Sequence, residues 1–98
     1  MSFNPPTVRL SALFFGQVQG VGFRYTVRKL ATQHRLTGYV QNLSGGEVKL
    51  IAEASEQKAI ELFLRELKNT RAAQGMVRQE LCWSSARDEF ESFRISYS

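Results

Sequence analysis

The sequence predicts a single α+β domain whose strands and helices follow the order β-α-β-β-α-β, with a short additional strand at the C-terminus. Two kinds of apolar spacing predict it: alternation with a period of two marks the strands, and recurrence at three or four residues marks the helices. The chain has 98 residues, of which 43% are hydrophobic, and this suits one compact core with no room for two. We therefore expect one domain over residues 1–98, in which residues 1–6 form a loose N-terminal segment.

The first predicted strand and the first predicted helix lie on either side of a glycine-rich stretch. Val8, Leu10, Ala12 and Phe14 occupy alternate positions in a segment that runs into Gly16, as expected for a strand. The spacing then becomes helical over residues 22–35, with apolar or half-polar positions at Phe23, Val27, Leu30, Ala31 and His34.

The middle of the chain predicts a hairpin followed by a second helix. An extended segment begins at Tyr39, is interrupted at residues 44–46 and resumes over residues 47–53, as in two strands joined by a turn. Ser55 is expected to cap the second helix, which ends near Asn69. One apolar stripe runs along this helix, through Ile60, Phe63, Leu64 and Leu67.

The C-terminal part predicts two strands separated by a polar loop. Alternation over residues 76–83 places one set of side chains on the same face, at Val77, Gln79, Leu81 and Trp83. Residues 84–92 form the loop, and the chain closes with a strand through Phe93, Ile95 and Tyr97. The whole order is the ferredoxin-like, or split βαβ, pattern. It predicts an open-faced sandwich in which two helices cover one face of a mostly antiparallel sheet.

Composition narrows the class of ligand and the compartment. Thirteen Lys and Arg against nine Asp and Glu give a formal charge of +4, which favours anionic ligands without choosing among phosphates, nucleic acid and acidic proteins. The basic residues are scattered, so we expect no tail that binds nucleic acid.

The apolar run over residues 10–15 is too short for a signal sequence, and no run would span a membrane, so we expect a cytoplasmic protein. Cys82 is the single cysteine, which excludes an internal disulfide and a multi-cysteine metal site.

The glycine-rich stretch is the strongest candidate for a binding site. Residues 16–24 read Gly-Gln-Val-Gln-Gly-Val-Gly-Phe-Arg. Glycines allow successive N–H groups to turn inward, and the start of a helix adds unpaired N–H groups and partial positive charge. Arg24 adds a permanently charged guanidinium able to hold two phosphate oxygens. The stretch matches neither a Walker loop nor a dinucleotide fingerprint; it indicates an anion site, with a turn required only for packing as the alternative.

Two motifs in this sequence resemble those of the acylphosphatase family. Residues 16–24 match every fixed position of the signature G-x-V-Q-G-V-x-F-R. Residues 38–46 resemble the second motif, G-W-V-x-N-x-x-D-G, with Tyr39 in place of Trp and Gly45 in place of Asp. Weaker similarity extends over residues 9–97, and so the resemblance covers nearly the whole chain.

The resemblance implies hydrolysis of the carboxyl–phosphate bond of small acyl phosphates, with inorganic phosphate as a product. By this resemblance, Asn42 orients the attacking water. The residues that bind phosphate are those of the loop, namely Gln19, Gly20, Val21, Gly22, Phe23 and Arg24. A carboxylate is a good leaving group that needs no general acid, so charge stabilisation and alignment are the main tasks. We expect a monomer that uses no cofactor. We also expect no metal ion, because the sequence has no Asp/Glu cluster to hold one.

Two departures from the family pattern bear on this site. Family members often end at the residue equivalent to Tyr97, whose terminal carboxylate can pair with the arginine equivalent to Arg24. Because Ser98 follows Tyr97 here, we expect that contact to be shifted or missing. Gly45 replaces the aspartate of the hairpin and is expected to change the rigidity of the turn more than the chemistry.

Two other residues with reactive side chains have simpler interpretations. His34 lies at the end of the first predicted helix, where an imidazole favours the helix dipole or shields the core, and we do not expect it to be catalytic. Cys82 lies on an alternating strand with no evident basic partner, so we expect a small packing residue rather than a nucleophile.

Two alternative functions remain open. RNA-recognition sheets share this order of elements, but residues 47–53, the third predicted strand, contain no aromatic side chain for stacking on a base. The second alternative is a module of the acylphosphatase shape that binds phosphate or carbamoyl phosphate without turnover, as would follow if Ser98 disturbed Arg24. Turnover of benzoyl phosphate separates the enzyme from this sensor, and salt-dependent RNA binding tests the first alternative.

Overall fold

The computed structural model describes residues 4–97, and its elements follow the predicted order. In chain order they are β1 (Val8–Gly16), α1 (Phe23–Gln33), β2 (Thr37–Asn42), β3 (Val48–Ala54), α2 (Gln57–Lys68), a 3₁₀ helix (Arg71–Ala73), β4 (Met76–Ser85) and β5 (Phe93–Ser96). Of the predicted loose segment 1–6, residues 4–6 belong to no helix or strand, and residues 1–3 lie outside the described residues. None of the described helices is long and apolar enough to cross a membrane.

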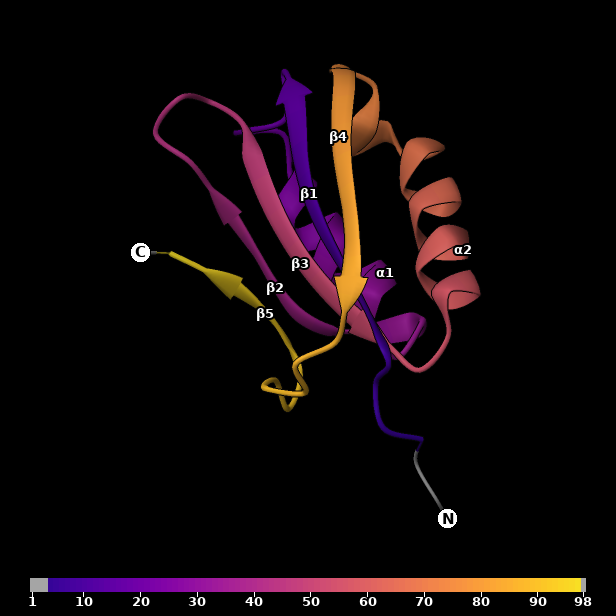
Figure 1. The fold of residues 1–98 in the computed structure, drawn as a ribbon. Helices are drawn as coiled ribbons and strands as arrows, with labels where there is room; N and C mark the ends of the chain where they lie inside the picture. The colour runs from indigo at the N-terminus through magenta and orange to yellow at the C-terminus, as the bar shows by residue number, and fades with distance from the viewer. Residues whose placement is uncertain (1–3, 98) are drawn as a thin grey trace.

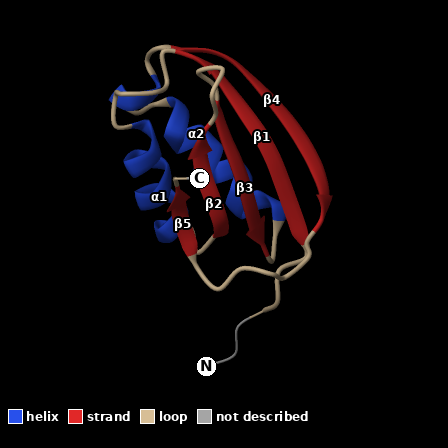
Figure 2. Ribbon diagram, turned by 90° about the vertical axis from the view of Figure 1, so that its left-hand side faces the viewer, coloured by secondary structure: helices blue, strands red, loops and turns tan. Residues whose placement is uncertain are grey.

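The five strands form one sheet in the order β4-β1-β3-β2-β5 (Figure 1). β1 pairs antiparallel with β3 and β4, β2 pairs antiparallel with β3, and β5 runs parallel to β2. Both α-helices lie on the same side of this sheet, and neither covers the other side (Figure 2). The predicted α+β open-faced sandwich with a short C-terminal strand is therefore confirmed.

Alternation along the strands separates the core from the open face of the sheet. In β1, Leu10, Ala12 and Phe14 are buried in the core that the strands share with the helices. The helices add six buried side chains to it, namely Phe23, Val27, Ala31, Ile60, Phe63 and Leu67. Burying a side chain of the size of Leu or Phe contributes about 1.5–3 kcal/mol, so this core fixes the strand and helix ends that carry polar side chains.

Gly38 allows β2 to pair closely with β3. Its φ of 138° lies in the region that favours glycine, and a Cβ at this position would lie 1.9 Å from the carbonyl oxygen of Ile51. No side chain fits into that space, because the clash is with backbone rather than with a movable side chain. Gly38 therefore fixes the course of the strand that ends at Asn42.

The starts of the two α-helices have no side-chain caps. Glu56 is the N-cap of α2, and its side chain makes no capping hydrogen bond, so the prediction that Ser55 caps this helix is wrong. Ser55 lies one residue too early, where its carbonyl accepts a hydrogen bond from Thr7 Oγ1 at 2.9 Å. Gly22 is the N-cap of α1 and has no side chain to offer. The N–H groups at the start of α1 are therefore left for another partner.

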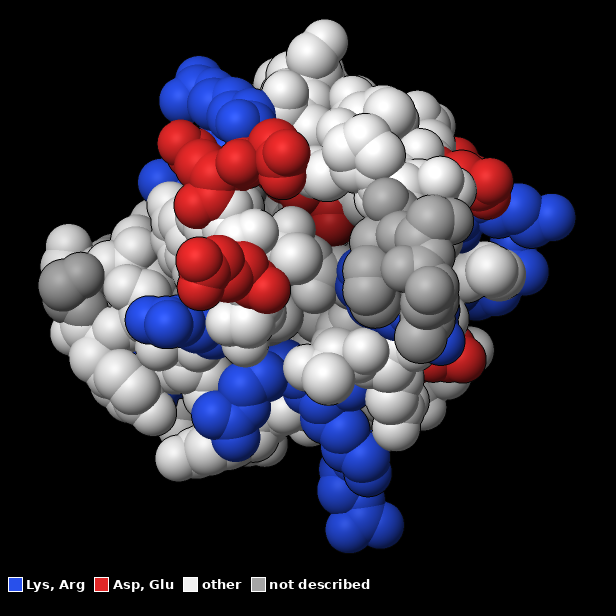
Figure 3. Space-filling model, turned by 90° about the horizontal axis from the view of Figure 1, so that it is seen from below, with Lys and Arg blue, Asp and Glu red and all other residues white. Residues whose placement is uncertain are grey.

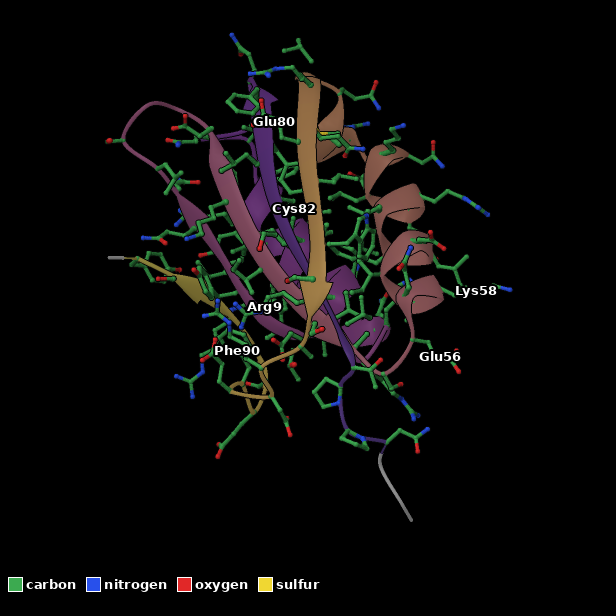
Figure 4. The ribbon with its side chains drawn as sticks, in the orientation of Figure 1. Arg9, Glu56, Lys58, Glu80, Cys82 and Phe90 are labelled. Atoms are coloured by element: carbon green, nitrogen blue, oxygen red, sulfur yellow. The ribbon has the colours of Figure 1, made fainter. Side chains whose placement is uncertain are left out.

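The edge strand β4 differs from its prediction in two ways. It continues to Ser85, beyond the predicted end at residue 83, so the loop before β5 is shorter than expected. Cys82 is exposed, and the prediction that it is a packing residue is wrong (Figure 4). The reason is the register: Cys82 pairs with Ser11, which alternates with the buried residues of β1 and so lies on the open face.

Candidate active site

The loop of residues 17–22, between β1 and α1, is anchored to the rest of the fold at both ends. Val18 and Phe23 are buried, and the Phe23 ring packs edge-on against Phe14 with ring centroids 5.3 Å apart. The N–H of Gln17 donates to the carbonyl of Gly75 at 2.8 Å. These anchors hold the two ends of the loop against the rest of the fold.

The middle of this loop presents a row of unpaired N–H groups. Gly20 and Gly22 have φ values of 76° and 79°, and a Cβ on either would meet no atom within 4 Å. These glycines are therefore needed for backbone conformation and not for space. Within residues 4–97, no N–H of residues 19–25 donates to a backbone carbonyl; the first helical bond runs from Thr26 to Gly22 at 3.1 Å. Such a nest at the positive end of a helix dipole suits an anion.

Arg24 adds a full positive charge at the same place. It is the second residue of α1 and is half-buried. Its guanidinium carbon lies 5.1 Å from the centre of the Tyr97 ring, a contact that orients the planar group without neutralising it. No carboxylate within residues 4–97 forms an ion pair with Arg24. The predicted effect of Ser98 on Arg24 lies outside the described residues.

Asn42 lies one residue beyond the last paired position of β2 and β5. It is the last residue of β2, and the parallel pairing of Gln41 with Ser96 makes Tyr97 the next neighbour of Asn42 in register. The Oδ1 atom of Asn42 is buried and has no hydrogen-bond partner, the one such side-chain atom within residues 4–97. Because β1 and β2 both run antiparallel to β3, the structure brings Asn42 to the same end of the sheet as the loop and Arg24.

Gln19 connects the loop to the hairpin that follows Asn42. Its Nε2 donates to the carbonyl of Leu43 at 2.8 Å and to the carbonyl of Glu47 at 3.0 Å. Neither partner has a signal in the sequence, because every residue type supplies a backbone carbonyl. The resemblance related the terminal carboxylate of Tyr97, and not its ring, to Arg24; the ring contact is seen only in the structure, where Tyr97 lies just beyond β5.

A second polar cluster lies at the opposite end of the sheet. The buried carboxylate of Glu53 accepts hydrogen bonds from Arg9 Nε at 2.8 Å and from the N–H groups of Arg87 and Asp88 at 2.8 and 3.0 Å. The guanidinium carbon of Arg9 also lies 5.4 Å from the ring centre of Phe90 (Figure 4). This cluster fastens the loop of residues 86–92 over the start of β1. Seen from this end, acidic side chains gather beside basic ones (Figure 3).

Hydrogen bonds and opposite charges together outweigh burial in this second cluster. Burial alone would raise the pKa of Glu53, but the hydrogen bonds from Arg87, Arg9 and Asp88, with the positive charge of Arg9, hold that pKa below its ordinary value. Burial alone would lower the pKa of Arg9, but its hydrogen bonds to Glu53 and Glu89, with the negative charges of both, raise it. Both groups are therefore held in their charged forms.

A family model described as Acylphosphatase matches residues 10–95 of this chain. The chain belongs to the acylphosphatase family. An acylphosphatase of Methanospirillum hungatei JF-1 is 46% identical over 70 residues, which cover 71% of this chain and 76% of the relative. One of Salinibacter ruber is 38% identical over 87 residues, covering 89% and 90%. The crystal structure of acylphosphatase from Bacillus subtilis superposes with a TM-score of 0.84 at 30% identity, covering 92% of this chain and 99% of that one.

The acylphosphatase family model covers every residue predicted for the site, and the fold gathers them at one end of the sheet. His34 is at the other end of α1, where it is the C-cap and its Nε2 lies 2.8 Å from Glu66 Oε2 of α2. At a rise of 1.5 Å per residue, His34 is roughly 15 Å along the helix from Arg24. Within residues 4–97, no three His, Cys, Asp or Glu side chains gather as metal ligands would.

Proposed function

We propose that this chain hydrolyses the carboxyl–phosphate bond of small acyl phosphates to a carboxylate and inorganic phosphate, by attack of water on phosphorus without a metal ion. Membership of the acylphosphatase family supports the reaction class. Three groups at one end of the sheet support the roles of individual residues. They are the N–H groups of the loop, the guanidinium of Arg24 and the amide of Asn42.

The loop and Arg24 bind the phosphoryl group. N–H groups of residues 19–24 donate to its oxygens, and the guanidinium of Arg24 holds two of them in a two-pronged contact. Negative charge in the transition state is spread over these same oxygens, so donors fixed beforehand lower the barrier. Because no carboxylate within residues 4–97 pairs with Arg24, its charge is available to the substrate.

Asn42 aligns the attacking water. A neutral amide offers a donor and an acceptor but cannot act as a base near neutral pH. The water oxygen forms its bond to phosphorus as the bond from phosphorus to the acyl oxygen breaks, and the carboxylate leaves with the electron pair. A proton of the water passes to a phosphoryl oxygen of the substrate. The carboxylate is stable without protonation, so the site needs no general acid.

The observation that carries the proposal is the unpartnered amide oxygen of Asn42, at the end of the sheet where the loop and Arg24 lie. Leaving a buried acceptor unsatisfied costs about 1–3 kcal/mol, and such a group at the same end of the sheet as an uncompensated cation indicates a contact kept for a ligand. The side chain of Asn42 makes no hydrogen bond within residues 4–97. A rotation that brings its amide to the surface therefore breaks no existing bond.

Hydrolysis of benzoyl phosphate after treatment with a chelator tests this function, with p-nitrophenyl phosphate as a comparison. We expect activity on benzoyl phosphate that survives the chelator and is much faster than on p-nitrophenyl phosphate, whose leaving group is poorer. Phosphate binding without turnover would identify the non-catalytic module instead. Loss of activity on chelation, with recovery on adding a metal, would make the metal-free mechanism wrong.

Arg24→Lys tests the phosphate contact. Lys keeps the charge but cannot reproduce the planar, two-pronged geometry. We expect a folded protein that has lost most of its activity and most of its affinity for inorganic phosphate, as measured by hydrolysis and calorimetry. Near-normal kcat/KM in this variant would remove Arg24 from the proposed role.

We also propose that the enzyme acts as a cytoplasmic monomer on a small-molecule substrate, without a nucleic-acid partner. The Cα radius of gyration of 12.6 Å is close to the roughly 13 Å expected for one compact domain of this size. Sedimentation equilibrium measures the mass in solution, and titration with RNA at low salt tests the nucleic-acid alternative.

A further inference from the structure

We infer that Gln19 is a positioning residue that holds the phosphate loop at a fixed distance from Asn42. This inference rests on the proposed function, because it concerns the alignment of the two groups that the reaction needs. It assigns the side chain of Gln19 to the hairpin between β2 and β3, in addition to the phosphate binding that the resemblance to the family gives to the loop amides, that of Gln19 among them.

The hydrogen bonds of Gln19 give the first part of the argument. Its Nε2 carries two N–H groups, and each has its own acceptor: the carbonyl of Leu43 at 2.8 Å and the carbonyl of Glu47 at 3.0 Å. Gln19 is half-buried. With both donors engaged on the hairpin, the amide nitrogen has no proton left for a phosphate oxygen.

The hairpin that receives these bonds is closed on itself. The N–H of Leu43 donates to the carbonyl of Glu47 at 2.9 Å, and the N–H of Gly46 donates to the carbonyl of Leu43 at 3.2 Å. Each carbonyl oxygen therefore accepts one hydrogen bond from within the turn and one from Gln19. These two bonds use both lone pairs of the oxygen. The side chain of Gln19 docks onto a rigid unit and not onto a loose loop.

The consequence for the site follows from the order of residues. Leu43 comes directly after Asn42, and Gln19 comes directly before the glycines that shape the phosphate nest. One side chain thus joins the backbone next to the water-aligning amide to the backbone that binds the phosphoryl group. A misplacement of about 1 Å between reacting groups can lower the rate by roughly 100-fold. Loss of this connection should therefore lower kcat more than it weakens phosphate binding.

Gln19→Met tests this role, since Met has nearly the same size and no donor. The matched control is Gln17→Met, because Gln17 is exposed, lies on the same loop and, within residues 4–97, makes no hydrogen bond but the backbone one to Gly75. We expect Gln19→Met to lower kcat for benzoyl phosphate by about 10- to 100-fold and to change the Kd for inorganic phosphate by less than about threefold. Gln17→Met should keep wild-type values of both.

Gln19→Glu adds a readout that a merely structural role would not move. The ionised carboxylate has no proton for either carbonyl, whereas the protonated acid supplies one O–H donor. We expect kcat of this variant, relative to wild type at saturating substrate, to rise as the pH falls. Circular dichroism checks the fold of each variant, and amide exchange at Leu43 and Gly46 should quicken in Gln19→Met.

The outcomes separate this inference from the proposed function. A wild-type protein that does not hydrolyse benzoyl phosphate overturns the function itself. An active wild type with an unchanged kcat in Gln19→Met overturns the positioning role alone. If phosphate affinity falls as far as kcat, Gln19 is a phosphate-binding residue and the inference is wrong. If Gln19→Met does not fold, a flat pH profile of the kcat ratio for Gln19→Glu overturns it.

Discussion

At the end of the sheet where β1 begins, the buried carboxylate of Glu53 accepts three hydrogen bonds; at the end where β1 finishes, the buried amide oxygen of Asn42 accepts none. The cations differ in the same way. Arg9 is paired with two carboxylates, and Arg24 is paired with none within residues 4–97. One end has every polar requirement met by the protein, and the other keeps its donors, its acceptor and its charge for a ligand.

Because of this difference, we expect mutations at the Glu53 end to change the free energy of unfolding, and mutations at the Asn42 end to change the catalytic rate. A satisfied buried network contributes to the free energy of unfolding and is costly to break. A set of unsatisfied groups contributes little to folding, and its removal is measured as a lost rate. Four changes test this division, and they are given from the largest expected effect to the smallest.

Glu53→Gln should be the most destabilising. It leaves Arg9 buried beside an amide that cannot balance its charge, and breaking a buried pair in this way costs roughly 3–5 kcal/mol. The control is Glu89→Gln, because the Glu89 side chain is 50% exposed and should cost at most about 1 kcal/mol. Urea unfolding measures both, and hydrolysis per folded molecule should be unchanged in each. Equal costs for the two variants would contradict the importance given to burial.

Asn42→Ala should reverse this pattern at the other end. We expect kcat to fall by about two powers of ten or more, or roughly 3 kcal/mol, because a contact that aligns the transition state is lost. The free energy of unfolding should not fall, since no hydrogen bond is removed and an unsatisfied buried acceptor is lost. Calorimetry should show that inorganic phosphate still binds and still stabilises the fold. Normal turnover would exclude Asn42 from the mechanism, and loss of phosphate binding would make it a binding residue.

Acid should weaken the Glu53 end selectively. Because the pKa of Glu53 is lower in the folded chain than in the unfolded one, its contribution to stability is present above the unfolded pKa of about 4.3 and is lost as the pH falls through the folded pKa. Arg9 stays protonated throughout this range and does not alter the sign. The stability difference between wild type and Glu53→Gln should hold from pH 7 to about pH 5 and shrink below about pH 4. A difference that grows with acid would contradict the pairing.

Gly45→Asp, which introduces the residue common in the family, should have the smallest effect. The φ of Gly45 is outside the left-handed region, so Asp fits the backbone, but its Cβ would lie 2.7 Å from Glu47 Oε1. The Glu47 carboxylate can move aside, and the two like charges at the surface should cost less than about 1 kcal/mol. We expect kcat within about threefold of wild type. A tenfold loss would mean that the turn takes part in alignment more directly.

Much of the fold was predictable because alternation and helical spacing are strong local signals. In the structure the register pairs Arg9 with Glu53 across β1 and β3. The local signals could not predict that residues 86–92 fold back over Glu53, because that contact depends on N–H groups that every residue type except proline has. Cys82 was mistaken for a packing residue because alternation does not distinguish an edge strand from a central one.

For the site, the sequence predicted where the residues lie but not which groups they contact. Its glycines and Arg24 were expected at a strand-to-helix turn, and the structure places them there, while their chemical roles remain predictions. Ser55 looked like a cap because caps are favoured by residue type, yet the chain enters α2 one residue later. The partners of Gln19 could not be foreseen, since hydrogen bonds to backbone carbonyls are determined by three-dimensional distance and not by side-chain pattern.

The position of Tyr97 has a consequence for how the enzyme becomes active. The phosphate loop follows the first strand of the fold, whereas the ring that orients Arg24 follows the last one. The parallel pairing of β5 with β2 joins distant parts of the chain, and contacts of that kind form late because loop closure must come first. Any form of the chain in which β5 is undocked lacks the ring contact that orients the guanidinium of Arg24. Recovery of hydrolysis after dilution from denaturant therefore reports the docking of β5, and so the completion of the fold.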